Sequence, residues 1–307
     1  MKQGVVTIEN SKYPKLLKGI PSPPEKIYYK GSWDASIFEN CLAVVGSRKM
    51  TAYGKQITIK LVSEISNAGI AIVSGFMYGI DATAHKAALD VGGRTIAVMP
   101  CGIDIIHPQH QESLYNEILE NNGLIISEFK GGFPPAIWTY PKRNRIVAGL
   151  SKATMVVEAG KKSGSLITAG LAKSYKRRLL VVPGPLTSLN SQGILQLIKD
   201  GADIVTSSED VLASYDTIRF ESPKVSSRLP SLNSIEQTVL EELQREPMKV
   251  DELSRFIKKS VAEIGTILSL MQLRGLLLEE GGEYYINTGR CNQRPVEAKP
   301  QPAKQTQ

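Results

Sequence analysis

The chain has 307 residues, 42% of them hydrophobic, and a formal net charge of +7. This length allows one large α/β domain with a small additional domain, and the lack of a long apolar run or a signal-like start predicts a cytoplasmic protein with no membrane association. The three cysteines show no CxxC spacing, so we expect neither disulfides nor a thiolate metal site.

The positive charge is unevenly distributed along the chain. Residues 233–286 contain six Lys and Arg against ten Asp and Glu, a net charge of −4, and residues 287–307 carry +3. Residues 1–232 therefore carry +8. Because a basic surface attracts anions, we expect an anionic partner to bind the larger part of the chain.

Residues 1–40 hold a proline-rich stretch at 19–24 and then Ile-Tyr-Tyr-Lys-Gly at 27–31, which predicts an extended arm with an edge strand. Residues 41–221 are predicted to form one domain, in which short apolar runs alternate with amphipathic helical patterns from residue 42 to about 205. The runs lie at 42–45, 70–73, 95–99, 124–126, 154–157, 179–182 and 203–205. Repeated βα units whose strands are apolar on both faces predict an α/β fold with a doubly wound parallel sheet.

Small and basic residues follow several of these strands. In a parallel sheet the carboxyl ends of the strands meet at one edge, where ligands bind, and small residues let backbone N–H groups approach a phosphate. Each such loop alone is also an ordinary chain turn. Together they predict an electropositive crevice contacted by Gly46, Ser47, Arg48, Gly75, Phe76, Lys161, Lys162, Gly164 and Ser165.

The segment 140–151 adds an aromatic residue and three cations to this edge. A proline near the start of an apolar helical pattern marks a helix entrance, whose backbone N–H groups favour anions. We therefore expect a phosphate-bearing ligand here, although a solvated basic first turn is the alternative. The predicted contacts are Tyr140, Lys142, Arg143, Asn144 and Arg145.

Signatures of catalysis and nucleotide binding are sparse. The first βα junction is not GxGxxG, and no GxxxxGK[ST] loop occurs. The three histidines lack metal-ligand spacing, and Asp81 and His85, four residues apart on one helix, are expected to pair locally. We predict no catalytic residues, no metal ligands and no cofactor.

The βα rhythm stops after about residue 207. Residues 222–232 are a polar linker rich in Ser and Pro, and residues 287–307 have the composition of a disordered tail. Between them, three helical patterns, the third opened by a Ser260–Glu263 capping box, precede a hairpin pattern. Residues 233–286 therefore read as a winged helix. Its negative charge opposes DNA phosphates, which predicts a protein-contact or regulatory role.

Six motifs, taken in order, resemble the DprA (Smf) family of bacterial DNA-processing proteins. They are VGSR (45–48), SGFMYGIDATAHKAAL (74–89), MPCGID (99–104), YPKRNRIVAGLS (140–151), EAGKKSGSLITA (158–169) and VPGPLTSLNSQGILQLIKDGA (182–202). The resemblance covers about residues 20–286. It implies an extended Rossmann fold that binds and protects single-stranded DNA and loads the recombinase RecA during natural transformation, without enzymatic activity.

The resemblance also gives roles to particular residues. Arg48 and the cations at 142, 143 and 145 match family positions that line the DNA pocket, and Tyr140 is the candidate base-stacking residue. Phe76 is a second candidate, with a loop aromatic covering the core edge as the alternative. The stretch 132–138 is apolar and free of lysine, so Lys142 would replace any upstream phosphate-binding lysine of relatives.

The resemblance further implies a homodimer. Ile194, Leu195, Leu197 and Ile198 could supply an apolar contact patch, or could face the core as a helix stripe.

Two other functions compete with DNA binding. Phosphoribohydrolases of the LOG type belong to the same superfamily, and their PGGxGTxxE motif ends in a glutamate that acts on the ribosyl bond. Thr168 stands at that position here, so the acid/base contribution has no carrier and we predict no such hydrolase. A nucleotide-sensing Rossmann module is the third possibility.

Overall fold

The computed structural model describes residues 2–215 and 233–286. The chain forms two compact units, Met1–Pro223 and Lys224–Gln307. The first contains the predicted α/β domain and the second the predicted winged helix. The predicted linker at 222–232 and the predicted disordered tail at 287–307 lie outside the described residues.

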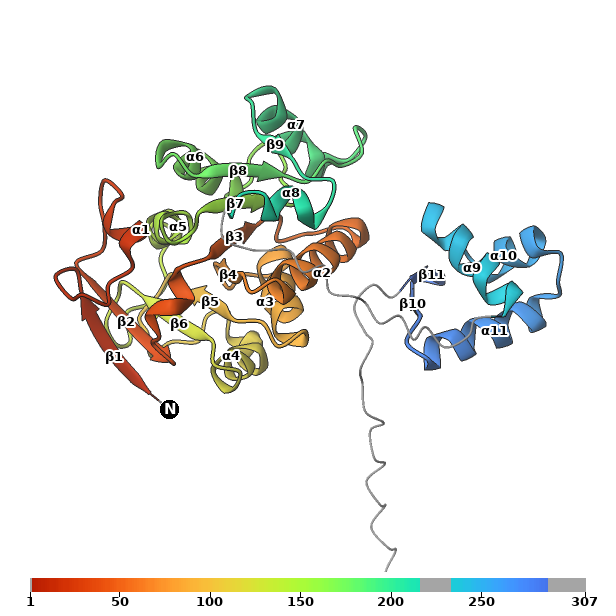
Figure 1. The fold of residues 1–307 in the computed structure, drawn as a ribbon, viewed down its shortest axis with the longest axis horizontal. Helices are drawn as coiled ribbons and strands as arrows, with labels where there is room; N and C mark the ends of the chain where they lie inside the picture. The colour runs from red at the N-terminus through yellow and green to blue at the C-terminus, as the bar shows by residue number, and fades with distance from the viewer. Residues whose placement is uncertain (1, 216–232, 287–307) are drawn as a thin grey trace, which may run out of the picture. The chain divides into compact units, whose positions relative to one another are not determined.

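The first unit is built on a nine-stranded sheet, which runs from β1 at the lower left of Figure 1 to β9 at the top. The strands are β1 (Gln3–Thr7), β2 (Lys26–Gly31), β3 (Cys41–Val45), β4 (Ala71–Ser74), β5 (Thr95–Val98), β6 (Leu124–Ser127), β7 (Ala153–Val156), β8 (Arg178–Val181) and β9 (Asp203–Ile204). Their order is β1-β2-β6-β5-β4-β3-β7-β8-β9. Strands β3 to β9 are parallel, which confirms the seven predicted strands and the Rossmann-like fold class.

The N-terminal segment belongs to this sheet. Strand β2 pairs antiparallel with β6 on one side and with β1 on the other, so the prediction that residues 27–31 form an edge strand was wrong. The edge is β1, where Gly4 leaves room for the ring of Tyr29 on the paired strand. The short helix α1 (Lys15–Lys18) buries Leu17 in the core, so β1, α1 and β2 all belong to the large unit.

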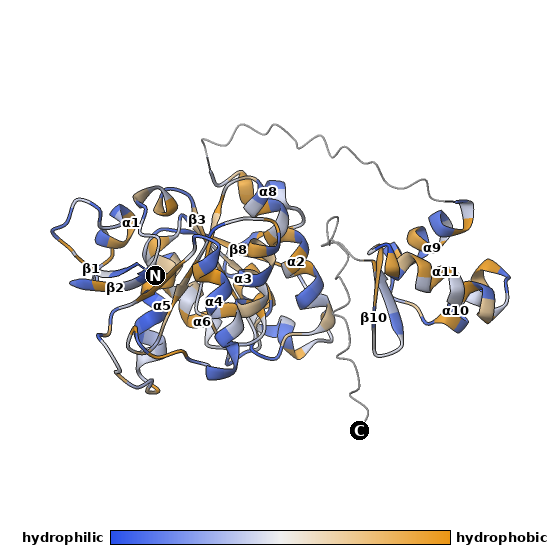
Figure 2. Ribbon diagram, turned by 90° about the horizontal axis from the view of Figure 1, so that it is seen from below, coloured by the Kyte–Doolittle hydropathy of each residue, from blue (hydrophilic) through white to orange (hydrophobic). Residues whose placement is uncertain are grey.

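Helices cover both faces of the sheet (Figure 1). One layer contains α2 (Ala52–Asn67), α3 (Ile80–Asp90), α4 (Glu112–Glu120) and α8 (Ser208–Leu212), and the other contains α1, α5 (Thr139–Leu150), α6 (Ser165–Ser174) and α7 (Gln192–Lys199). The helices carry both hydrophilic and hydrophobic turns in Figure 2, as amphipathic helices do. None of the helices in the described ranges is long and apolar enough to cross a membrane.

Helix α7 directs its apolar residues into the core. Ile194 is buried, and Leu197 and Ile198 pack against the same cluster as Leu17. The core-facing alternative is therefore confirmed for these three residues. Homodimerisation stays a prediction with no surface assigned to it.

The chain reverses direction across the sheet at β3. This strand has β4 as one neighbour and β7 as the other, and the helices that follow β3 and β6 lie on opposite faces. In doubly wound sheets the loops at the carboxyl ends of two such strands separate and leave a crevice. The topology thus places a ligand site above β3 and β7.

The second unit is a winged helix. It contains α9 (Ser234–Arg245), α10 (Val250–Ile257), α11 (Val261–Leu273) and the hairpin of β10 (Leu277–Glu280) with β11 (Glu283–Ile286). Leu253, Ile264 and Leu268 are fully buried in its core. The predicted capping box is present, since Ser260 Oγ accepts from the Glu263 N–H and the Glu263 carboxylate accepts from the Ser260 N–H.

Candidate nucleic-acid site

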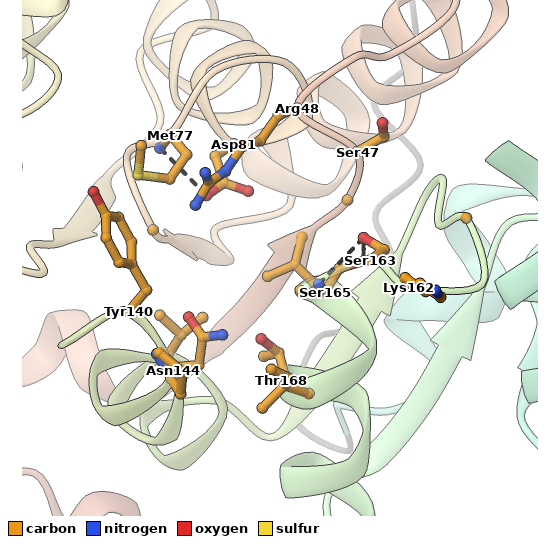
Figure 3. Close-up of a pocket in the computed structure, with 18 of the residues that line it drawn as sticks. Ser47, Arg48, Met77, Asp81, Tyr140, Asn144, Lys162, Ser163, Ser165 and Thr168 are labelled. Atoms are coloured by element: carbon orange, nitrogen blue, oxygen red, sulfur yellow. Dashed lines mark hydrogen bonds between the residues drawn. The ribbon is translucent and has the colours of Figure 1, made fainter. Parts of the chain in front are cut away.

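A cavity of about 680 Å³ lies at the carboxyl ends of β3, β4 and β7. Its walls come from the loops after β3 and β4, the start of α5 and the loop that leads into α6, as Figure 3 shows. Ten predicted contacts line it: Gly46, Ser47, Arg48, Gly75, Tyr140, Arg143, Asn144, Lys162, Gly164 and Ser165. The ten predicted contacts, from Gly46 to Ser165, are thus brought from several distant loops into one site, as the topology requires.

The loop after β3 folds tightly against the start of α3. The Ser47 carbonyl accepts from the Ile80 N–H at 3.2 Å, and the Ser47 hydroxyl accepts from the Lys49 N–H at 3.1 Å. Gly79 has φ +71°, and a side chain there would collide with the Ser47 carbonyl, so only glycine permits this approach. The fold holds Ser47 and the exposed Arg48 at the upper rim of the cavity (Figure 3).

A buried carboxylate fastens this loop to the end of β7. Glu158 accepts from the Thr51 N–H at 2.9 Å and from the Thr51 hydroxyl at 2.5 Å. The Asn190 amide donates to Glu158 at 3.4 Å and to the Lys49 carbonyl at 2.7 Å. We call Thr51, Glu158 and Asn190 the loop clasp. Sequence reasoning missed it, although an acid directly after an apolar strand was a visible signal.

Arg48 and Tyr140 face each other across the cavity. The Arg48 guanidinium carbon lies 5.3 Å from the centre of the Tyr140 ring, within the range of a cation–π contact. The Tyr140 hydroxyl hydrogen-bonds His107 Nε2 at 2.8 Å, which fixes the ring. Burial, with the charges of Arg48 and Arg143 next, lowers the pKa of His107 and favours the neutral imidazole. A flat ring and a cation therefore stand together in the site.

Arg143 lies on the cavity floor and is 4% exposed. Its guanidinium donates to the carbonyl of Gly75, directly after β4, and at 2.6 Å to that of Val98, the last residue of β5. Burial lowers its pKa to about 10, so the side chain keeps its charge at neutral pH. Nη1 donates to both backbone carbonyls, and Nε donates to the Asn144 side-chain oxygen at 3.2 Å. Arg143 therefore supplies positive potential at the cavity floor, and its direct contact with a phosphate stays a prediction.

Four predicted contacts lie outside the cavity lining: Phe76, Lys142, Arg145 and Lys161. Phe76 is fully buried at φ +58° and packs edge-on against Tyr115, so the prediction that it stacks on a base was wrong. The alternative, a loop aromatic that covers the core edge, is confirmed. Phe76 points inward because its backbone turns there into the left-handed region.

The other three are cations beside the site. Arg145 forms an ion pair with Glu128 and donates to the Ser22 carbonyl, which holds it away from the cavity. Lys142 Nζ lies 3.4 Å from the same Glu128 and is 41% exposed. Lys161 is exposed next to the lining residue Lys162. The predicted cluster of cations is thus divided between the cavity and its surroundings.

Asp81 and His85 do not form the expected local pair. Asp81 lines the cavity and accepts from the Met77 N–H at 3.3 Å, and burial raises its pKa. His85 Nδ1 lies 2.6 Å from the Thr95 hydroxyl, which itself donates to the Ile72 carbonyl. Nδ1 therefore carries the hydrogen, and burial lowers the pKa of His85 to about 3.

The wall formed by α6 has no acid. Thr168, the residue expected to stand where LOG-type hydrolases have a glutamate, is 2% exposed and lines the cavity. Asp81 is the one carboxylate among the lining residues of the described chain, and it already accepts from the Met77 amide. The cavity can hold an anion and a ring, with Thr168 offering no general acid or base.

The sequence and the fold were compared with those of known proteins. The family model of DNA recombination-mediator protein A matches residues 4–216, and that of the DprA winged helix domain matches residues 223–283. Protein Smf of Synechocystis is 33% identical over 91% of this chain and 79% of its own length. DNA processing protein DprA of Streptococcus pneumoniae is 40% identical over 66% of this chain and 71% of its own.

Solved structures give the same result. The X-ray structure of the Streptococcus pneumoniae DprA has a TM-score of 0.65 and 37% identity over 72% of this chain and 76% of that one. A structure of DNA processing protein A from Helicobacter pylori, described for its single-stranded DNA binding mode, has a TM-score of 0.61 and 34% identity over 68% of this chain and 94% of that one. The chain therefore belongs to the DprA/Smf family of DNA-processing proteins.

Proposed function

We propose that this protein binds single-stranded DNA in the cavity at the carboxyl ends of β3, β4 and β7. The observation that carries the proposal is the pairing of Arg48 with Tyr140, 5.3 Å apart, inside a cavity lined by small residues. A single strand offers unpaired bases that stack on aromatic rings and phosphates that attract cations. The relative from Helicobacter pylori, described by its single-stranded DNA binding mode, supports the same ligand.

The shape of the site favours a single strand over a duplex. Duplex bases are already paired and stacked, so reaching Tyr140 would require a base to leave the helix at a cost of a few kcal/mol. A strand with free bases does not pay this cost. The hydroxyls of Ser163 and Ser165, 2.7 Å apart at the start of α6, line the cavity, and one of the pair can donate to a phosphate.

The proposed role is binding without chemistry. Hydrolysis of a nucleoside monophosphate needs an acid or base at the ribosyl bond, and Thr168 occupies the wall where that group would act. Release of free base from a nucleoside monophosphate by the purified protein would contradict a purely binding role.

The family supports a wider role in recombination. We propose that the protein protects bound single strands from nucleases and loads a RecA-type recombinase on them during transformation, acting as a homodimer. Protection is measured as survival of a labelled strand under nuclease, and loading as faster filament assembly on strands coated with single-strand-binding protein. Sedimentation gives the oligomeric state.

The first test is a titration of labelled single-stranded and double-stranded oligonucleotides at several salt concentrations. We expect tighter binding of the single strand, and a loss of roughly tenfold or more in Arg48→Ala and in Tyr140→Ala. Lys60→Ala, which removes an exposed cation on the outer side of α2, is the matched control and should leave binding unchanged. Unchanged binding by both cavity variants would show that the site is elsewhere.

A further inference from the structure

Three aromatic residues form an exposed cluster beside the cavity. Phe129 and Phe133 stack with ring centres 4.7 Å apart and planes at 10°, and Trp138 packs edge-on at 5.8 Å and 5.9 Å from them. Phe133 is 37% exposed and Trp138 is 54% exposed. Large apolar rings are seldom left open to water without a partner, so we call this cluster the aromatic platform and consider what covers it.

A cation stands over the platform. Lys142 Nζ lies 5.1 Å from the centre of the Phe129 ring and 5.9 Å from that of Trp138. Glu128 is its neighbour, but that carboxylate also pairs with Arg145, so two cations share one negative charge. The platform therefore combines flat rings with a net positive charge, which is the combination that single-stranded nucleic acid requires.

The platform is continuous with the cavity. Ile137 and Pro141, four positions apart, line the cavity, and Ile137 is 92% exposed at its rim. Trp138 and Lys142 each follow one of these two residues in the chain, and the Lys142 N–H donates to the Trp138 carbonyl at 3.4 Å. The platform thus adjoins the cavity rim at the entrance to α5. A strand that leaves the cavity past Ile137 and Pro141 reaches Trp138 next.

We propose that the aromatic platform is a second base-binding position, where one base of the strand leaving the cavity stacks on Trp138 and Lys142 holds the adjoining phosphate. This inference rests on the proposed function, because it extends the same strand. It also gives a role to Lys142, which does not line the cavity. A second copy of this chain or a protein partner on the platform is the competing outcome.

Tryptophan fluorescence gives a direct test, because a base stacked on indole quenches its emission. The chain has two tryptophans. Trp33 packs between Tyr29 and Phe38 near the amino end of β6, whereas the platform follows the carboxyl end of that strand. In the Trp33→Phe variant, emission comes from Trp138 alone. We expect single-stranded DNA to quench it with the same midpoint as binding followed by anisotropy of labelled DNA.

The two proposals fail differently in this experiment. Absence of any change in anisotropy would overturn the proposed function. Normal anisotropy with unchanged Trp138 emission would overturn the platform and leave the cavity intact. Quenching that depends on protein concentration without DNA would assign the platform to a second copy of the chain and would also overturn the inference.

Affinity measurements with strands of different length provide the second test. Trp138→Ala should weaken binding of a strand of about 20 nucleotides roughly tenfold and leave a strand of about 4 nucleotides, which fills only the cavity, nearly unchanged. Trp138→Phe keeps a flat ring and should restore most of the affinity. Ile204→Ala, which removes another exposed apolar side chain on edge strand β9, is the control. Equal losses for both lengths would overturn the second position.

Discussion

The loop clasp leads to a prediction for Glu158: its substitution should weaken DNA binding even though Glu158 does not line the cavity. Glu158 accepts two hydrogen bonds from Thr51, at 2.9 and 2.5 Å, and so holds the loop that carries Arg48. In Glu158→Gln the charge is lost and only one acceptor oxygen remains. The new amide NH₂ group then faces one of the two Thr51 donors, and two donors cannot hydrogen-bond each other. Hydrogen bonds to a charged group contribute about 1.5–3 kcal/mol each. The loop should therefore shift at a local cost of about 2–4 kcal/mol.

Only part of this cost should appear in DNA binding. The clasp acts on DNA through the loop, so the lost affinity cannot exceed what Arg48 and its loop contribute. We expect an approximately tenfold loss for Glu158→Gln, which corresponds to about 1.4 kcal/mol. In a unit of this size each kcal/mol lowers the melting temperature by about 2–4 °C, so a cost of about 2–4 kcal/mol predicts a fall of roughly 4–16 °C.

Two measurements separate positioning from general destabilisation. The slope of log affinity against log salt counts neutralised phosphates at about 0.7 per contact for a single strand. Glu158→Gln removes no cation, yet the slope should fall by about 0.7 because Arg48 is displaced. In a double-mutant cycle, Glu158→Gln should cost little in the Arg48→Ala background, whereas its effect should add to that of Lys142→Ala. A normal slope together with additivity in both cycles would refute the role of the clasp.

Four further outcomes are expected. Tyr140→Ala should lower single-strand affinity roughly tenfold in anisotropy titrations while Tyr140→Phe stays near wild type, and equal losses would argue against stacking. Arg48→Ala should itself reduce the salt slope by about 0.7. Burial lowers the pKa of His85 in the folded protein to about 3, below its ordinary value of 6.5. The stability that depends on neutral His85 is therefore complete above about pH 6.5 and falls with the pH, by about 2 kcal/mol at about pH 5. Denaturant unfolding should show this loss in the wild type and not in His85→Gln. Removal of residues 224–307 should leave single-strand affinity within about twofold, because the cavity lies wholly in the first unit, and a large loss in that truncation would assign DNA contacts to the winged helix.

The central strands could be predicted because burial on both faces leaves a continuous apolar run. Strand β3 is buried at all five of its residues, and its neighbours show the same pattern. Strand β1 was missed because it is partly exposed, contains Gly4, and gains its stability from pairing with β2 about two dozen residues later. Its sequence carries little signal without that partner, since strand propensity depends on cross-strand packing.

Several contacts of the site could not be predicted because they join residues that are far apart in the sequence. Glu158 and Thr51 are 107 positions apart, so no local pattern joins them into a clasp. Arg143 finds its acceptors at Gly75 and Val98 on two strands of the sheet. The side to which a loop aromatic such as Phe76 turns depends on one backbone angle, which residue type alone does not reveal.

The basic segment at the start of α5 was predicted to contact one ligand with all of its cations, but its side chains face different directions. Consecutive residues of an α-helix point about 100° apart, so adjacent cations cannot all face one ligand. Taking Tyr140 as the reference, the positions three, four and seven residues later share its face, and Arg143, Asn144 and Val147 do line the cavity. Lys142 and Arg145 fall on the neighbouring face, where Glu128 meets both. The helical period therefore separates Arg143, which adds positive charge at the cavity floor, from Lys142 and Arg145, which pair with Glu128 outside the cavity lining. Composition alone conceals this separation.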